Sequence, residues 1–403
     1  MSVALVAALD TKAEDADFLA SRLQSRGHEV TVVDTGVLGE PGFPADVSRA
    51  TVARAGGSSL AELVARRDRS AAVAVMTTGA THVLADLHAR GRLTGAMAIG
   101  GGAGTTIGAT ALRGLPLGLP KVVLSTLAAE TSRFVGTSDL VLFPSIVDVA
   151  GVNRISRVSY ARAADALAGM VEGSADTREE AYTAPLVAAT MFGVTTPCVQ
   201  RAKARLESAG CEVLVFHACG AGGQMMERLV DDGLVDAVLD VTTTEWADEI
   251  LGGILTAGPH RLEAAARAGV PQVVSLGATD MANFGPLRTL PARFHGRRLY
   301  EHTADSTLLR VSVDEAAAIG AAIGDKLRAA VGPATMVVPR RGVSALDVAG
   351  APFDDPHARA ALSEAVRDEL SGSGVRFEEH DLHINDDAFA DRLAEGLLRQ
   401  LAR

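Results

Sequence analysis

The sequence predicts an α/β fold with two Rossmann-like subdomains, each a doubly wound parallel sheet, and it indicates an internal duplication. Short apolar runs alternate with segments of helical periodicity along most of the chain. A polar run at residues 172–183 separates two such series, so residues 1–180 and 181–403 are expected to form separate domains. Residues 23–34 also align without a gap with residues 206–217, sharing Leu, Ser, Gly, Glu and two Val. Chance agreement over so short a stretch is the alternative to duplication.

Length, charge and cysteine content limit the class of protein. A chain of 403 residues, 48% hydrophobic and 22% charged, is expected to fold into more than one compact domain. The net charge of -11 argues against a nucleic-acid binder or a membrane-surface protein, and 4% aromatic residues argue against a base-stacking surface. Three cysteines, no run of about 18 apolar residues and a start without a basic signal region favour a cytoplasmic location and no membrane partner.

The first domain is expected to begin with a buried strand at residues 3–9, followed by a helix. Thr11 and Glu14 fit the S/T-x-x-E capping box at the start of that helix. Further apolar runs predict five more strands, at residues 29–33, 71–76, 96–99, 122–124 and 140–143. Helices are expected around residues 60–67, through residue 87, and at residues 156–170. Ligands of such sheets bind beyond the carboxyl ends of the strands, where polar residues of this chain gather.

A glycine-rich stretch at residues 100–108 follows the expected strand 96–99 and leads into a helix. The backbone N–H groups of its glycines and the positive end of the helix dipole together favour an anion such as phosphate. The stretch is no P-loop, because no lysine follows its last glycine, and it does not follow the first strand as a dinucleotide fingerprint would. A tight strand-to-helix turn, with glycines for close packing, is the alternative.

We expect a nucleotide to bind at this loop and at the neighbouring strand ends. The candidate residues lie after the first five expected strands: Asp10, Thr11, Lys12, Asp34, Thr77, Thr78, Gly79, Gly101, Gly102, Gly104, Thr105, Thr106, Ser125 and Thr126. Lys12 and Lys121 are the nearest candidate cations, and Asp139 or Asp148 could help to hold magnesium through water. Thr11 as a helix cap and Asp34 as a turn residue are the structural alternatives, and no metal ligand is assigned.

The second domain repeats the alternation of strands and helices. Strands are expected at residues 186–191, 212–217, 237–241, 272–275, 335–338 and 375–378. Helices are expected at residues 197–208, 224–231, 245–255, 260–268, 314–328, 356–370 and 386–401. Polar residues and glycines at the strand ends predict a second ligand crevice, with the candidates Thr195, Thr196, Gly220, Gly222, Gly223 and Thr243.

A candidate acid–base set for that crevice consists of His217, Glu245 and Asp280, which end or follow three different strands. A hydrogen-bonded structural histidine is the alternative for His217. The spacing of histidines and cysteines gives no zinc motif, and Cys198 and Cys219 fit small core residues better than nucleophiles.

Eight motifs, in order along the chain, resemble one protein family. They are IGGGAGTTIGATALRGLPLGLPKVVLST, VGTSDLVLFPSIVDVAGVNRISR, MFGVTTPCV, EVLVFHACGAGG, LDVTTTEWADEILGG, GATDMANFG, RGVSALD and HINDDAFAD. The family includes the N-terminal inhibitory domain of the tomato mosaic virus resistance protein, and its bacterial members are known as ATP-binding-domain-like proteins. The resemblance covers essentially the whole chain and implies two Rossmann-like halves, ATP with magnesium in the first half, and a homodimer.

Two departures from the family pattern lie at the expected nucleotide site. The loop of the family commonly reads Gly-Gly-Ser-Gly-Gly-Thr, whereas this chain has Ala103 in place of the serine and Thr105 in place of a glycine. The usual Val-Ala-Ser-Gly after the fifth expected strand is Leu-Ala-Ala-Glu here, which brings the carboxylate of Glu130 near the site. The resemblance therefore implies a phosphate site made of backbone groups, without a serine contact.

The sequence thus predicts a protein that binds ATP with magnesium. One hypothesis is an ATP-dependent enzyme that acts on a small metabolite bound in the second domain. The other is a non-catalytic module whose ATP-bound form engages a protein partner, and a third interpretation replaces ATP by another phosphorylated metabolite. Whether the protein is an enzyme stays open.

Overall fold

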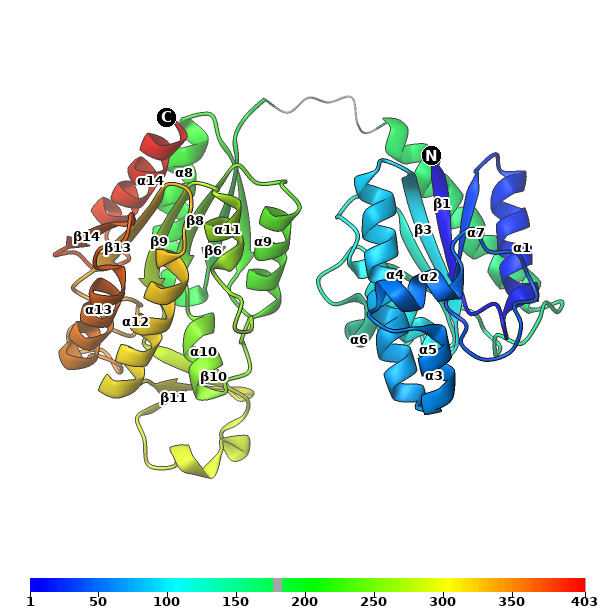
Figure 1. Cartoon of the computed structure of the whole chain (residues 1–403). Helices are drawn as coiled ribbons and strands as arrows, with labels where there is room; N and C mark the ends of the chain where they lie inside the picture. The colour runs from blue at the N-terminus through cyan, green and yellow to red at the C-terminus, as the bar shows by residue number, and fades with distance from the viewer. Residues whose placement is uncertain (177–182, 403) are drawn as a thin grey trace. The chain divides into compact units, whose positions relative to one another are not determined.

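The computed structural model describes residues 1–176 and 183–402 of the chain. It forms two compact units, Met1–Ala181 and Tyr182–Arg403, and each contains its own parallel sheet (Figure 1). The expected domain boundary at residues 180 and 181 lies outside the described residues.

The first unit contains a five-stranded parallel sheet in the order β2-β1-β3-β4-β5. Its strands are β1 (Ser2–Ala7), β2 (Val30–Asp34), β3 (Leu93–Gly100), β4 (Lys121–Ser125) and β5 (Val141–Pro144). Every residue of β1 and β4 is buried, which explains the nearly continuous apolar sequence of these strands. The edge strand β5 is partly exposed.

Helices cover both faces of this sheet, so that it is doubly wound (Figure 1). Val3 and Leu5 of β1 pack with α1 and α7 on one face, whereas Ala4 and Val6 pack with α2, α4 and α5 on the other. The helices are α1 (Ala13–Ser25), α2 (Arg49–Ala55), α3 (Leu60–Arg66), α4 (Arg69–Ala89), α5 (Gly102–Arg113), α6 (Thr131–Val135) and α7 (Ser156–Asp176).

The strand expected at residues 71–76 is wrong, because these residues lie inside the 21-residue helix α4. The side chain of Asp68 caps this helix by accepting the N–H of Ala71 at 3.1 Å. Burial follows a helical period, with Ala72, Met76, Ala80 and Leu84 facing the core. A short apolar run fits a buried strand and a buried helix equally well, and here the surrounding helix decides.

The capping box expected at Thr11 and Glu14 is also wrong, because α1 begins after Lys12 and no side chain caps it. The hydroxyl of Thr11 donates to the carbonyl oxygen of Ala8 instead, at 3.4 Å. The carboxylate of Glu14 accepts the N–H of Val152, 138 positions along the chain. A tertiary contact thus replaces the local one.

The second unit contains a six-stranded parallel sheet in the order β14-β13-β9-β8-β6-β7. Its strands are β6 (Leu186–Met191), β7 (Glu212–His217), β8 (Ala237–Thr242), β9 (Gln272–Gly277), β13 (Ala334–Pro339) and β14 (Arg376–His380). Counted in chain order, the first five strands of each sheet occupy the same positions, 2-1-3-4-5. An internal duplication would produce this shared order.

Helices again cover both faces of the sheet, which confirms the prediction of two doubly wound α/β subdomains. One face packs against α8 and α14, and the other packs against α9 to α13. The helices are α8 (Thr196–Ser208), α9 (Ala221–Asp231), α10 (Glu245–Leu251), α11 (Glu263–Ala268), α12 (Val313–Arg328), α13 (Pro356–Leu370) and α14 (Asp387–Leu401). The helix expected at residues 245–255 ends early, at Gly252, which adopts a left-handed conformation with φ 74°.

The second unit also contains a small antiparallel sheet that the sequence analysis did not predict. Its strands are β10 (Met281–Phe284), β11 (Leu299–Thr303) and β12 (Ser306–Arg310), in the order β10-β12-β11. Short 3-10 helices lie at Gly193–Thr195, Leu287–Thr289 and Ala292–Phe294. All four residues of β10 are buried, so the small sheet is anchored to the core through this strand.

Candidate functional site

The strand order of the first unit locates its candidate ligand site. The chain passes from β1 to β2 on one side and then to β3 on the other side, so the connections reverse between β1 and β3. In open α/β sheets ligands bind outside the carboxyl ends of the strands at such a switch point. Asp10 and Thr11 follow β1, and the glycine-rich loop follows β3. The structure therefore brings these two segments to one place.

The glycines of the loop fall into two kinds. A Cβ atom at Gly100 would lie 2.5 Å from the Cα of Gly104, and one at Gly108 would lie 2.4 Å from the Cβ of Ala98, so packing requires both glycines. By contrast, a Cβ atom at Gly102 would meet nothing within 4 Å. At Gly101 it would meet only the hydroxyl of Thr126, at 3.8 Å. The space in front of Gly101 and Gly102 is open to a ligand.

The backbone at the start of α5 offers hydrogen-bond donors. Gly101 is the N-cap residue, and its carbonyl oxygen accepts the N–H of Thr105 at 2.7 Å. Within the described part of the chain, no acceptor is bonded to the N–H groups of Gly102, Ala103 and Gly104. These donors lie in the first turn of a 12-residue helix, at the positive end of its dipole, which is a favourable position for an anion.

Thr105 and Ser125, whose hydroxyls were predicted to contact phosphate, are buried beside the glycine-rich loop. The Oγ1 of Thr105 and the Oγ of Ser125 lie 2.6 Å apart, and both residues are fully buried. Ser125 also accepts the N–H of Leu127 at 2.8 Å. The hydroxyl of Thr106 donates to the carbonyl oxygen of Gly102 at 3.0 Å. Thr105 and Ser125 therefore tie β3, α5 and β4 together, and Thr126 is the exposed hydroxyl beside the loop.

The residues after β1 are largely occupied by contacts within the protein. Asp10 accepts the N–H groups of Val37 and Leu38 at 3.0 and 2.9 Å, which fixes the loop after β2 against the end of β1. The ammonium group of Lys12 donates to the carbonyl oxygen of Val149. Lys121 is buried at the opposite, amino end of β4, where its ammonium group pairs with Asp139 at 2.6 Å.

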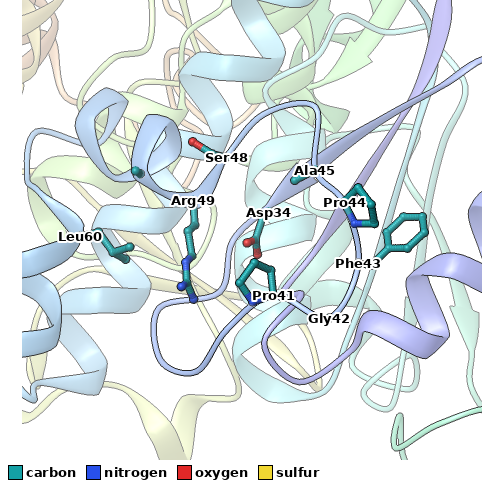
Figure 2. A pocket seen from close by; sticks show the side chains of 10 residues that line it. Asp34, Pro41, Gly42, Phe43, Pro44, Ala45, Ser48, Arg49 and Leu60 are labelled. Atoms are coloured by element: carbon teal, nitrogen blue, oxygen red, sulfur yellow. The ribbon is translucent and has the colours of Figure 1, made fainter.

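Asp34 ends β2 and lines a cavity of about 530 Å³ (Figure 2). One oxygen of its buried carboxylate, Oδ1, accepts the N–H groups of Leu9 and Gly36 at 3.0 and 2.8 Å. Pro41, Phe43 and Leu60 give the cavity an apolar wall. Arg49 also lines it and donates to the carbonyl oxygens of Leu38 and Gly39. A cavity with an apolar wall and one carboxylate suits a nucleoside.

Thr77, Thr78 and Gly79 do not belong to this site, because they lie in the middle of α4 and not at a strand end. The hydroxyls of Thr77 and Thr78 donate to carbonyl oxygens of their own helix, at 2.7 and 3.2 Å. A Cβ atom at Gly79 would lie 1.9 Å from the carbonyl oxygen of Val52, so this glycine allows α4 to pack closely against α2. Their role is structural.

In the second unit, the predicted strand-end threonines are bonded to one another and to the sheet. The hydroxyls of Thr195 and Thr242 lie 2.8 Å apart, and Thr243 donates to the carbonyl oxygen of Ser275 at 3.0 Å. All three threonines are fully buried. Thr196 donates to the carbonyl oxygen of Phe192 at 3.2 Å. The hydroxyls of the three buried threonines are therefore bonded within the carboxyl end of the sheet, whereas Thr196 is half-buried.

The second glycine-rich stretch, at the start of α9, is occupied by a side chain of the protein. The Oε1 atom of Glu245 accepts the N–H groups of Gly220 and Gly223 at 2.8 and 3.1 Å. A Cβ atom at Gly223 would lie 2.3 Å from the other oxygen of Glu245, and one at Gly222 would lie 1.8 Å from the carbonyl oxygen of His217. These glycines therefore make room for an internal carboxylate and for close packing.

Arg261, which the sequence analysis missed, is the centre of a buried ion cluster beside this helix. Its Nε donates to Glu245 at 2.6 Å, and its two terminal nitrogens donate to Asp240 at 2.6 and 2.9 Å. Nη1 also contacts Glu227 at 3.1 Å. Burial raises the pKa of Glu245 and of Glu227, and Arg261 opposes that rise. The partners lie 16 to 34 positions from Arg261 in the chain, so no local sequence signal joins them.

The candidate acid–base residues are neither hydrogen-bonded nor ion-paired to one another in the described part of the chain. His217 is exposed, and its Nδ1 lies 3.1 Å from the carbonyl oxygen of Met191. Asp280 is buried and accepts the hydroxyl of Ser344 at 2.8 Å, and burial raises its pKa to about 7. No hydrogen bond or ion pair in residues 1–176 and 183–402 connects two of His217, Glu245 and Asp280. Cys198 is a core residue, and burial raises the pKa of its thiol.

Two further observations concern metal ions and membranes. Among the described residues, no group of three or more His, Cys, Asp or Glu side chains is arranged to hold a metal ion. Each helix in the same part of the chain is too short or too polar to cross a membrane.

The fold and the site define a class of protein: two doubly wound α/β domains, with an open, glycine-rich helix start at the switch point of the first. Residues 1–176 match the N-terminal domain of the Uncharacterised protein family UPF0261, and residues 184–401 match its C-terminal domain. The chain belongs to this family.

Named relatives agree with this assignment. A UPF0261 protein of Clostridium tetani is 42% identical over 402 residues, which cover 100% of this chain and 99% of that protein. A UPF0261 protein of Rhizobium meliloti is 44% identical over 389 residues, covering 96% of each chain. The ToMV resistance protein Tm-1(GCR237) of Solanum lycopersicum is 41% identical over 335 residues, which cover 82% of this chain and 44% of the tomato protein. The resemblance to the family of the tomato resistance protein is thereby confirmed.

Proposed function

We propose that the first unit binds ATP with magnesium, with the phosphates at the start of α5. The observation that carries the proposal is the set of N–H groups of Gly102, Ala103 and Gly104, which have no acceptor among the described residues. Unpaired N–H groups at a helix start and the helix dipole stabilise phosphate without a lysine. Ala103 lacks the hydroxyl of the family's serine but keeps its N–H, so it does not remove this backbone contact.

The cavity at the end of β2 favours a nucleotide over a simple phosphate. Neighbouring strands lie about 4.8 Å apart, so the ends of β2 and β3 are separated by roughly 10 Å across β1. This span suits a nucleoside near Asp34 with its phosphates near Gly102. Phe43 and Leu60 would contact the base, and the carboxylate of Asp34 would accept hydrogen bonds from the ribose.

Magnesium would be held mainly by phosphate oxygens and water, with few ligands from the protein. No cluster of three suitable side chains exists among the described residues. Of the two aspartates considered from the sequence, Asp139 is paired with Lys121 and Asp148 accepts the N–H of Val149. Magnesium commonly binds nucleotides in this way, through one or two carboxylates at most.

We propose a homodimeric, cytoplasmic protein without a nucleic-acid partner, on the strength of the family resemblance and the net charge of -11. ATP turnover on a small metabolite is one role for the bound nucleotide. A non-catalytic role, in which the ATP-bound form engages a protein partner, is favoured by a specific observation. The candidate residues His217, Glu245 and Asp280 are each bonded to other groups and not to one another.

Isothermal titration calorimetry with ATP, ADP, inorganic triphosphate and orthophosphate, each with and without magnesium, tests the proposal. We expect ATP with magnesium to bind most tightly and orthophosphate least tightly. Equal affinity for ATP and triphosphate would exclude a nucleoside pocket, and no binding of either would exclude the phosphate site. An assay for released ADP, AMP or pyrophosphate across a panel of metabolites separates the enzyme from the non-catalytic module.

A further inference from the structure

A second cavity, of about 280 Å³, lies in the second unit between α13 and the carboxyl ends of β9, β13 and β14. Its floor is apolar and is formed by Leu276, Val338, Val343 and Leu362, which belong to the hydrophobic core of this unit. None of the residues predicted for the second crevice lines this cavity. Its size suits a small metabolite, since it is slightly smaller than the pockets of about 300–1,000 Å³ that hold drug-sized ligands.

Arginine side chains with unused donors stand at the rim of this cavity. Arg359 donates through Nη1 alone, to Asp347 and Asp354 at 2.7 and 3.0 Å. Its Nε and Nη2 groups, and the whole guanidinium of Arg340, make no hydrogen bond with the described residues. The backbone N–H of Arg340 donates to the carbonyl oxygen of His380 at 2.9 Å, which fixes the position from which its side chain extends. The guanidinium of Arg340, whose charge also helps to lower the pKa of Glu379, and two donor groups of Arg359 are therefore available to a ligand.

The charges of the lining residues set the charge of the ligand. Three arginines, Arg340, Arg359 and Arg367, and two glutamates, Glu364 and Glu379, line the cavity, and Arg359 is already bonded to two further carboxylates that do not line it. Arg367 and the hydroxyl of Ser363 already bind Glu379. Arg340 is the lining arginine that is hydrogen-bonded to no carboxylate among the described residues, so it favours a ligand with one negative charge, whereas the second charge of a phosphate dianion would lie next to two glutamates.

We propose that this cavity binds a small organic monocarboxylate, with the carboxylate between Arg340 and Arg359 and a short aliphatic body on the apolar floor. A planar guanidinium matches a carboxylate through two parallel hydrogen bonds. The position also fits the general rule for α/β sheets, because the cavity opens beyond the carboxyl ends of parallel strands. The site is formed wholly by residues of the second unit.

Ligand-observed NMR titration of the full chain with isovalerate and hexanoate tests this site, with isovaleramide and inorganic phosphate as comparison probes. We expect the carboxylates to bind and the neutral amide to bind at least tenfold more weakly, since it lacks the charge. Arg340→Gln should weaken carboxylate binding by about tenfold or more, because a charge-assisted hydrogen bond is lost. Arg340 makes no hydrogen bond through its side chain in the described protein, so this variant should fold normally.

Three further variants make the result specific. Arg341→Gln changes the neighbouring exposed arginine, which does not line the cavity, and should leave binding unchanged. Ala360→Leu enlarges an exposed residue of α13 that does line it, and should abolish binding by filling the space. Gly102→Val, in the first unit, should leave carboxylate binding intact even if ATP binding is lost. Tighter binding of phosphate than of carboxylate, no preference over the amide, or full binding by Arg340→Gln would overturn the proposal.

Discussion

The carboxylate of Glu245 accepts the backbone N–H of Gly220 at 2.8 Å and thereby fills the anion position at the start of α9. Its Oε1 atom also accepts the N–H of Gly223, and Arg261 balances its charge from the other side. The start of α5 in the first unit offers the same chemistry at Gly102, with no carboxylate bound among the described residues. One glycine-rich helix start thus holds an internal oxyanion, and the other is free to hold one from a ligand.

Replacing Arg261 by methionine is expected to lower the free energy of unfolding of the second unit by about 3–5 kcal/mol. The reason is that Arg261→Met leaves Asp240, Glu245 and Glu227 buried together without a cation. Urea unfolding followed by tryptophan fluorescence measures this change. The chain has a single tryptophan, Trp246, which is buried in the second unit and reports on that unit alone.

The matched control for this variant is Arg267→Met in α11. Arg267 also pairs with an aspartate, Asp231, but both side chains are about half exposed, at 60% and 43%. Surface pairs of this kind contribute about 0–1 kcal/mol, so the control should unfold almost like the unchanged protein. If both variants lost the same small amount, the buried cluster would have no special role in stability.

Asp248 is expected to make the stability of the second unit depend on pH. Burial raises the pKa of Asp248 to about 7, although its carboxylate accepts the N–H and the side-chain amide of Asn283. The unfolded state has a pKa of about 3.8 at this residue. Between that pH and about pH 7, the folded state therefore holds a proton that the unfolded state has released. The protonated carboxyl of Asp248 thus contributes to the free energy of unfolding at low pH, and this contribution is lost as the pH rises toward and through 7.

The measurement is the free energy of urea unfolding at pH 5 and pH 8 for the unchanged protein and for Asp248→Asn. The amide mimics the neutral acid, so the variant should gain about 2 kcal/mol relative to the unchanged protein between these pH values. Asp231→Asn, at an exposed position, serves as the control and should show no such gain. A relative shift in the opposite direction would contradict a raised pKa at Asp248.

The sequence predicts most strands of the two parallel sheets, because continuous apolar runs such as residues 3–7 and 122–124 are typical of strands buried on both faces. It misreads residues 71–76, where the same kind of run lies in a helix. The hairpin of β11 and β12 was missed because neither strand alternates between apolar and polar residues: β11 is largely exposed, and four of the five residues of β12 are buried. The glycine-rich loop is located correctly at the end of a strand, since strand, glycines and helix are adjacent in the chain.

The sequence does not reveal which polar groups are already hydrogen-bonded to other groups of the protein. Thr105 and Ser125 look like phosphate contacts in the sequence, but their hydroxyls are bonded to each other in the core. Gly220 and Gly223 look like a second anion site, but Glu245, more than 20 positions away, is bonded to them. Occupancy of this kind depends on contacts between distant residues, and only the folded structure supplies it.

Gly102→Val is expected to weaken ATP binding by at least a hundredfold while leaving the fold unchanged. A Cβ atom at this position meets no protein atom within 4 Å, so the side chain would occupy only the space proposed for the phosphates. Calorimetry with ATP and magnesium measures the loss. The control is Gly169→Val, an exposed helical position of α7 that is equally open, which should bind ATP normally. Equal binding by both variants would place the phosphates elsewhere.

Asp34→Asn is expected to weaken the binding of ATP but not the binding of inorganic triphosphate. The side-chain oxygen of asparagine can still accept the N–H groups of Leu9 and Gly36, so the end of β2 should keep its structure, as circular dichroism can verify. The charge that faces the cavity is lost, and hydrogen bonds to a charged group are worth about 1.5–3 kcal/mol, so ATP should bind about tenfold more weakly. Inorganic triphosphate has no ribose and should bind both proteins equally in the same calorimetric titration. If the variant lost affinity for ATP and triphosphate alike, Asp34 would act on the glycine-rich loop and not on a nucleoside.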